Sequence, residues 1–298
     1  MIPRLLTIFA SVLLATAAIA DSDNALPLWR VSGAHNDVYL LASVHLLRPS
    51  DYPLPVGIDI AYDDAETLVM ELDMDDLDQA EAATLVSELG EIKDGRNLAM
   101  LMGTADFARA TQLANKAAIP LEAFAGAEPW LAAITTEEIL LTRLGFESSL
   151  GLEQQLMKRA VADGKEIRGL ETLREQLEIL DRLPLAVQRR LLLQTLEEGV
   201  DIESVMDELL SAWRRGDADE LARTVLADMR EEPLLYRELV VRRNRNWVTQ
   251  ISELLQHEDD YLVIVGALHL VGDDGVPGLL ERRGFKVSQM RSATVPGR

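Results

Sequence analysis

The chain of 298 residues contains no cysteine. This absence excludes disulfide bonds, thiolate metal sites and a cysteine nucleophile, so any chemistry must use histidine, carboxylate, arginine, serine or backbone groups. Basic residues are also scarce, because 29 Lys and Arg face 50 Asp and Glu for a net charge of −21. That deficit argues against a nucleic-acid partner, which needs a basic surface, and against adhesion to anionic lipid.

Long apolar runs are confined to the N-terminus. Arg4 precedes an uncharged stretch, 5–20, that ends in Ala18-Ile19-Ala20. A charged start, a short apolar core and an A-x-A site predict a secretory signal peptide over residues 1–20, cleaved after Ala20. An uncleaved anchor is the alternative, but the run is shorter than the ~20 apolar residues that a spanning helix prefers. We therefore expect an exported protein, periplasmic or secreted, with no stable membrane anchor after cleavage.

Strand-like patterns lie towards both ends of the chain, whereas the middle is helical in pattern. Glycine and proline interrupt the helical pattern at plausible helix ends. The sequence predicts an α/β (α+β) fold, with a mixed β-sheet built from the N- and C-terminal parts and a large, mostly helical insertion at about 76–256. We expect one domain over residues 21–298. The expected strands are 28–32 and 38–44 (as a hairpin), 67–72, 165–170, 261–267 and 285–289.

Two of the four histidines have matching surroundings. His45 lies in LASVHLL and His269 in VGALHLV, each three residues after a tiny residue that closes an apolar run. A histidine at the C-terminal end of a buried strand stands where open α/β sheets hold their ligands. Two imidazoles at one sheet edge could bind a metal or carry protons. The alternative is a pair of hydrogen-bonded core histidines.

Two carboxylates occupy the same kind of position. Glu71 ends the apolar run 68–70, and Glu171 follows the predicted strand 165–170. Each alone is equally compatible with an acid in the first turn of the next helix. Two histidines and one carboxylate, however, form a metal-ligand set with open positions for water and substrate. His45, His269 and Glu71 are therefore the candidate metal ligands.

An arginine lies on an apolar helical stripe. Arg243 is four residues from both Leu239 and Trp247, so helical periodicity places it on the buried face of 239–255. A buried guanidinium needs an anionic partner. Glu71, Glu171 or a substrate carboxylate could supply it, and an arginine that reaches solvent at the edge of the stripe is the alternative.

With these residues in place, the sequence resembles the TraB/GumN family, whose relatives include the TIKI proteins, described as metal-dependent proteases. The family pattern comprises two G-x-x-H motifs, a proline-containing loop, an LVxE strand, a GLET element and a helix bearing RN and W. The counterparts occur in this order over essentially the whole mature chain. They are Ala42-Ser43-Val44-His45, Pro53-Leu54-Pro55, Leu68-Val69-Met70-Glu71, Gly169-Leu170-Glu171-Thr172, Arg243-Asn244 with Trp247, and Gly266-Ala267-Leu268-His269.

The resemblance implies that His45, His269, Glu71 and Arg243 form the active site. Ala42 stands where the family has glycine, a change that weakens the site only if the backbone there needs a positive φ or a very close approach.

The leading functional hypothesis is an exported metal-dependent hydrolase, with a peptidase as its narrower form and a peptide or small envelope molecule as substrate. The two histidines would hold a divalent ion (Mn, Co or Zn), with Glu71 as third ligand or general base. Arg243 would steady a carboxylate or oxyanion, and Glu171 completes the catalytic candidates. One alternative is a non-catalytic envelope protein that binds a peptide or saccharide in the same cleft. Another is metal-free hydrolysis with His45 and His269 as proton carriers.

Overall fold

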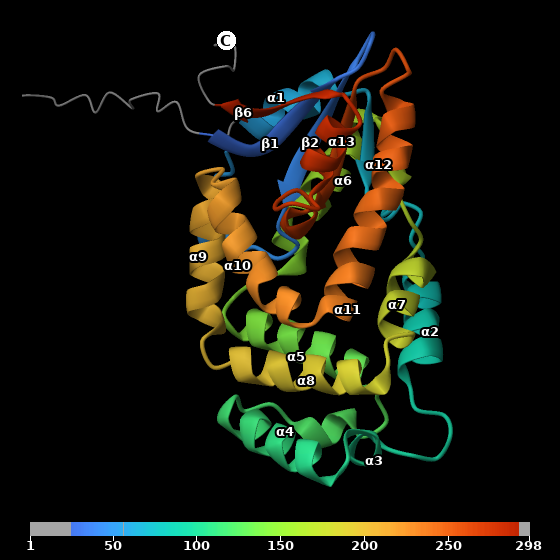
Figure 1. Cartoon of the computed structure of the whole chain (residues 1–298), viewed down its shortest axis with the longest axis vertical. Coiled ribbons are helices and arrows are strands. Elements are labelled where there is room, and N and C mark those ends of the chain that lie inside the picture. The colour runs from blue at the N-terminus through green and yellow to red at the C-terminus, as the bar shows by residue number, and fades with distance from the viewer. Residues whose placement is uncertain (1–24, 56, 292–298) are drawn as a thin grey trace, which may run out of the picture.

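The computed structural model describes residues 25–55 and 57–291, so the predicted signal peptide lies outside the described residues. A six-stranded sheet has the order β4-β3-β5-β2-β1-β6 (Figure 1). Strands β4, β3, β5 and β2 are parallel, whereas β1 is antiparallel to both β2 and β6. The α/β prediction with a mixed sheet from both ends of the chain is confirmed. The strands are β1 (Ala25–Ser32), β2 (Asp37–Ser43), β3 (Thr67–Met70), β4 (Glu166–Gly169), β5 (Tyr261–Gly266) and β6 (Lys286–Arg291).

The composition of the central strands explains why they are buried on both faces of the sheet. Every residue of β5 is buried, as is every residue of β3. Continuous Val, Ile and Leu runs are typical of parallel strands that are covered on both faces. The carboxyl ends of the parallel strands β2, β3, β4 and β5 lie at one edge of the sheet. The residues that follow these strands therefore lie close together at that edge.

The helical middle lies between β3 and β5, and the predicted strand β4 interrupts it and pairs with β3 at the edge of the sheet. Its helices are α2 (Gln79–Gly90), α3 (Leu98–Met102), α4 (Thr104–Lys116), α5 (Pro129–Arg143), α6 (Leu152–Asp163), α7 (Leu173–Asp181), α8 (Leu185–Glu198), α9 (Ile202–Arg214), α10 (Ala218–Glu231), α11 (Pro233–Tyr236) and α12 (Arg243–Leu254). Outside it lie α1 (Gly57–Asp64) and α13 (Val276–Arg282). Short turns are η1 (Pro49–Asp51), η2 (Leu121–Phe124), η3 (Ser148–Leu150), η5 (Ala267–His269) and the π-helix η4 (Arg237–Arg242).

Three apolar clusters support this arrangement, and the smallest consists of Leu183, Val187 and Leu235. The main core surrounds the sheet and includes the buried Trp213 and Trp247. A second core joins α3, α4, α5 and α8 at the end of the molecule away from the sheet (Figure 1). Over residues 25–55 and 57–291, no helix has the length and apolar character needed to cross a membrane.

Candidate active site

The two matching histidines meet at one edge of the sheet. Strands β2 and β5 are parallel neighbours with Ser43 opposite Gly266, and each histidine follows the end of its strand. Gly266 leaves the space in which the site side chains converge. A Cβ there would lie 3.4 Å from His45 Nε2, 3.3 Å from Glu71 Oε1 and 3.8 Å from His269 Cδ2.

Glu71 follows β3 directly and is held by both of its oxygens. Oε1 accepts a hydrogen bond from the Gly266 N–H at 2.7 Å, and Oε2 accepts one from the Arg243 Nη2 at 2.6 Å. Burial by itself would raise the pKa of Glu71. The charges of Arg243 and His45, with the Gly266 N–H, outweigh burial and lower this pKa to about 2. Glu71 is therefore a carboxylate at any physiological pH.

Arg243 lies between the two carboxylates predicted as its partners. Nε donates to Glu171 Oε1 at 2.9 Å, and Nη2 donates to both Glu71 and Glu171. Nη1 contacts His269 Nε2 at 2.9 Å and donates to the Leu239 carbonyl at 3.4 Å. These contacts engage all five guanidinium N–H groups.

The helical segment expected over 239–255 forms, but its first part is a π-helix instead of an α-helix. The π-helix η4 ends at Arg242 and α12 begins at Arg243. The wider π turn changes the helical phase just before the site. Arg243 still faces the interior, with its guanidinium carbon 4.6 Å from the centre of the Trp247 ring, while Arg242 and Arg245 are exposed.

Asn244 fixes the protonation of His269. The buried amide donates to the His269 and Asp274 carbonyls, so its Oδ1 faces His269 Nδ1 at 2.6 Å. An acceptor at that position requires a proton on Nδ1, which leaves Nε2 as the acceptor from Arg243. Burial also lowers the pKa of His269 to about 3, so the ring is neutral.

Glu153 is a site residue that the sequence did not reveal. It lies in the first turn of α6, is buried, and accepts hydrogen bonds from the Ser43 hydroxyl and from His45 Nδ1, the latter at 2.6 Å. Glu153 Oε2 has no hydrogen-bond partner among the described residues. An acid in a first helical turn is common, and nothing in the local sequence indicates that α6 packs on the end of β2.

His45 faces a cavity, and its Nδ1 contacts the Glu153 carboxylate. The charge of Glu153 is the main reason that the pKa of His45 rises to about 9. The side chain is 58% exposed, into a cavity of about 280 Å³ that Glu71, Glu153 and Gln176 also line. At neutral pH, His45 is therefore a protonated imidazole with access to solvent.

Ala42 causes no backbone strain. It is fully buried within β2, and Ala118 is the only non-glycine residue with a positive φ in the described ranges. Its carbonyl accepts a hydrogen bond from Trp213 Nε1 at 2.7 Å. The replacement of the family glycine by alanine is therefore harmless to the conformation of this strand.

Gly151 allows α6 to approach His45, and Gly151→Ala is expected to break this arrangement. The added Cβ would lie 2.0 Å from the His45 carbonyl oxygen, a backbone atom that cannot move aside alone. We expect a loss of about 1–3 kcal/mol in the free energy of unfolding. NMR titration would show the pKa of His45 falling towards its ordinary value as Glu153 moves away. Gly126→Ala, with nothing within 4 Å of the new Cβ, is the control. An equal stability for the two variants would contradict this prediction.

The arrangement does not fit a three-ligand metal centre of His45, His269 and Glu71. Over the described residues, no group of three His, Cys, Asp or Glu side chains is placed to hold a metal ion. Both nitrogens of His269 and both oxygens of Glu71 are engaged, in each case partly by Arg243. The guanidinium thus supplies the positive charge that a metal ion would bring to these side chains.

The fold and the site define an α/β protein with a histidine, carboxylate and arginine cluster at its strand ends. The model of the TraB/PrgY/gumN family matches residues 27–289, and the chain belongs to this family. It is 24% identical to the uncharacterized protein YbaP of Escherichia coli strain K12, over 81% of this chain and 87% of YbaP. It is 30% identical to a metalloprotease TIKI homolog of Amphimedon queenslandica, over 51% of this chain and 35% of that protein. No solved structure matches the chain at comparable significance.

Proposed function

We propose that this protein is a hydrolase, with peptides as the first substrate class, in which His45 transfers the proton. The observation that carries the proposal is the contact of 2.6 Å between His45 Nδ1 and the buried Glu153 carboxylate, at the wall of a cavity shared with Glu71. A carboxylate behind an imidazole orients the ring and stabilises its charged form. The relative named as a metalloprotease supports peptide-bond hydrolysis as the reaction class.

The site contains an acid and a base on one side of Gly266. His45 is protonated at neutral pH because its pKa is about 9, so it donates a proton to the leaving nitrogen. Glu71 is ionised and lines the same cavity as His45, so it accepts the proton of the attacking water. Arg243 has no free N–H for a developing oxyanion. It acts instead as a positioning residue that holds Glu71.

We further propose that the chain is exported, with residues 1–20 as a signal peptide. The support is the charged start, the apolar run and the A-x-A site.

The test is hydrolysis of a peptide mixture in H₂¹⁸O, followed by mass spectrometry. The probe is a tryptic digest of albumin. Parallel samples contain EDTA, or one of the added ions Mn²⁺, Co²⁺ and Zn²⁺. We expect new peptide termini that carry one ¹⁸O, in equal yield with and without EDTA. Peptides left intact in every arm would contradict the hydrolase and favour a binding protein. Loss of cleavage in EDTA, restored by one of the three ions, would contradict the metal-free step and support the metal-dependent form.

A further inference from the structure

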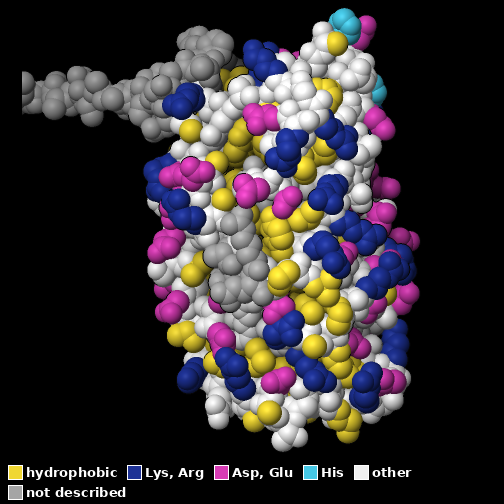
Figure 2. All heavy atoms as spheres, in the orientation of Figure 1, with side chains coloured by type: hydrophobic (Ala, Val, Ile, Leu, Met, Phe, Trp, Pro, Cys, Tyr) yellow, Lys and Arg dark blue, Asp and Glu magenta, His cyan; other side chains and the backbone are white. Residues whose placement is uncertain are grey.

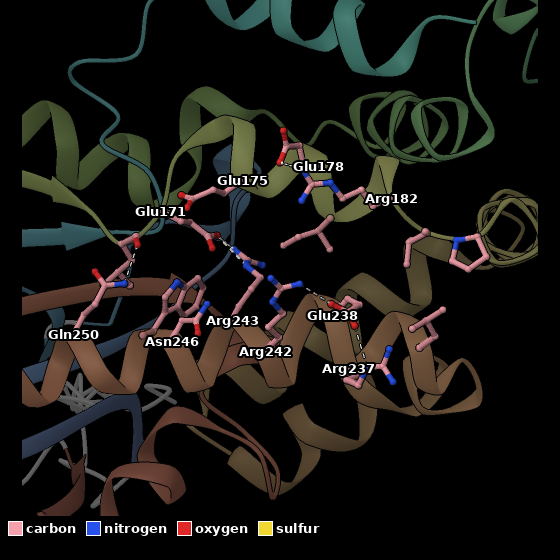
Figure 3. Close-up of a pocket in the computed structure, with 16 residues that line it drawn as sticks. Glu171, Glu175, Glu178, Arg182, Arg237, Glu238, Arg242, Arg243, Asn246 and Gln250 are labelled. Atoms are coloured by element: carbon pink, nitrogen blue, oxygen red, sulfur yellow. Dashed lines mark hydrogen bonds and ion pairs between the residues drawn. The ribbon is translucent and has the colours of Figure 1, made fainter.

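A second cavity lies on the other side of the Arg243–Glu171 ion pair. Its volume is about 620 Å³, and it opens between α7 and the segment formed by η4 and α12 (Figure 3). It shares no lining residue with the cavity of His45, but Glu171 and Arg243 line it. The ion pair therefore separates two cavities with different linings. We call this one the arginine cavity.

The inner lining of the arginine cavity includes apolar side chains from both sides. Trp247 and Leu183 are buried, and Ile179 and Leu234 are partly exposed. Side chains of this kind favour an aliphatic group of a ligand, because filling the space removes apolar surface from water.

Three arginines form the rim. Arg182, Arg237 and Arg242 have side chains that are 64–70% exposed. Figure 3 shows Arg182, directly after α7, and Arg242 from the facing segment, both directed towards the space between the helices. Figure 2 shows Lys and Arg side chains, with Asp and Glu side chains among them, on the side of the molecule where Figure 1 places α7 and α12. The lining as a whole balances four arginines against four glutamates, in a chain whose net charge is −21.

The carboxylates in the lining do not saturate these arginines. Arg237 and Arg242 share Glu238, and Arg182 pairs with Glu178. Each of these three pairs engages part of a guanidinium that has five donors. The other two carboxylates are used elsewhere. Glu171 pairs with Arg243, and Glu175 accepts from the Thr172 N–H and hydroxyl at the start of α7.

We propose that the arginine cavity binds the C-terminal end of a peptide. The free α-carboxylate would pair with the rim arginines, whose planar donors match a carboxylate in a bidentate manner. The last side chain, an aliphatic one, would lie on the apolar lining. The assignment needs no hydrolysis, so it stands or falls separately from the proposed reaction.

The test compares acetyl-Ala-Gly-Leu with a free carboxylate and the same tripeptide with a C-terminal amide, by calorimetry on the full chain. We expect the acid to bind about tenfold or more tightly than the amide, because the amide lacks the charge that the arginines recognise. The double variant Arg182→Gln/Arg242→Gln should lose a similar factor. Arg109→Gln is the matched control, because Arg109 is an exposed arginine on α4 with one glutamate partner, Glu197.

Three results would overturn the proposal. They are equal affinity for acid and amide, unchanged affinity in the double variant, and binding of 4-methylpentanoate as tight as that of the tripeptide acid. The last would assign the cavity to small carboxylates instead of peptides. His45→Ala should bind the tripeptide acid with unaltered affinity, so a failure of the proposed hydrolysis leaves this measurement intact.

Discussion

Replacement of His45 by alanine should lower kcat/KM for peptide hydrolysis by about 10²–10⁴-fold, the range that one positioned acid or base contributes. The ring is the only solvent-accessible imidazole among the described residues that line the cavity beside Glu71. His269 is buried and neutral, with both nitrogens engaged. It therefore offers no replacement proton donor.

Glu153→Gln separates a proton-transfer role of His45 from a merely structural one. Glutamine keeps the size of the side chain but removes the charge that raises the pKa of His45 to about 9. The acid form of His45 is lost as pH rises through its pKa. The alkaline limb of the kcat/KM profile should therefore move from about pH 9 in the native chain towards about 6.5 in the variant.

His35→Ala is the matched control for both variants, since His35 is an exposed histidine in the turn between β1 and β2. Its profile should follow that of the native chain. Circular dichroism checks that every variant is folded. An unchanged kcat/KM in His45→Ala, or an alkaline limb that stays in place in Glu153→Gln, would show that His45 is not the proton donor.

Replacement of Arg243 by leucine should lower the free energy of unfolding by about 3–5 kcal/mol, the usual cost of removing one partner from a buried ion pair. Glu71 and Glu171 have side chains only 14% and 10% exposed. Without the guanidinium they would face each other as two buried like charges. Urea denaturation of the native chain and the variant gives the difference directly.

A triple variant shows whether the cost comes from charge. Arg243→Leu combined with Glu71→Gln and Glu171→Gln removes both carboxylate charges, and most of the lost stability should return. Arg245→Leu, which replaces an exposed arginine on the same helix, should change stability by less than about 0.5 kcal/mol.

If Arg243→Leu does not fold, Arg243→Lys should give an intermediate loss, because one ammonium cannot span both carboxylates and His269. A loss below about 1 kcal/mol in Arg243→Leu would refute the central role of the guanidinium.

Local sequence determined a large part of this structure. The strand patterns placed the sheet, and the matching surroundings of His45 and His269 predicted that they meet, because parallel strands end at one edge. Helical spacing placed Arg243 on a buried face, and its burial demanded an anionic partner.

The tertiary structure alone decided which atoms of these residues remain free to bind a ligand or to transfer a proton. Glu153 reaches His45 because α6, more than 100 residues further along the chain, packs on the end of β2 through Gly151. Asn244 and Arg243 engage both nitrogens of His269, which turns a predicted metal ligand into a neutral hydrogen-bonding group. Periodicity reports which face a residue lies on, but hydrogen bonds between distant segments depend on packing. For that reason the sequence could name His45, His269, Glu71, Glu171 and Arg243, while only the fold showed that His45 faces the cavity and Arg243 is fully engaged.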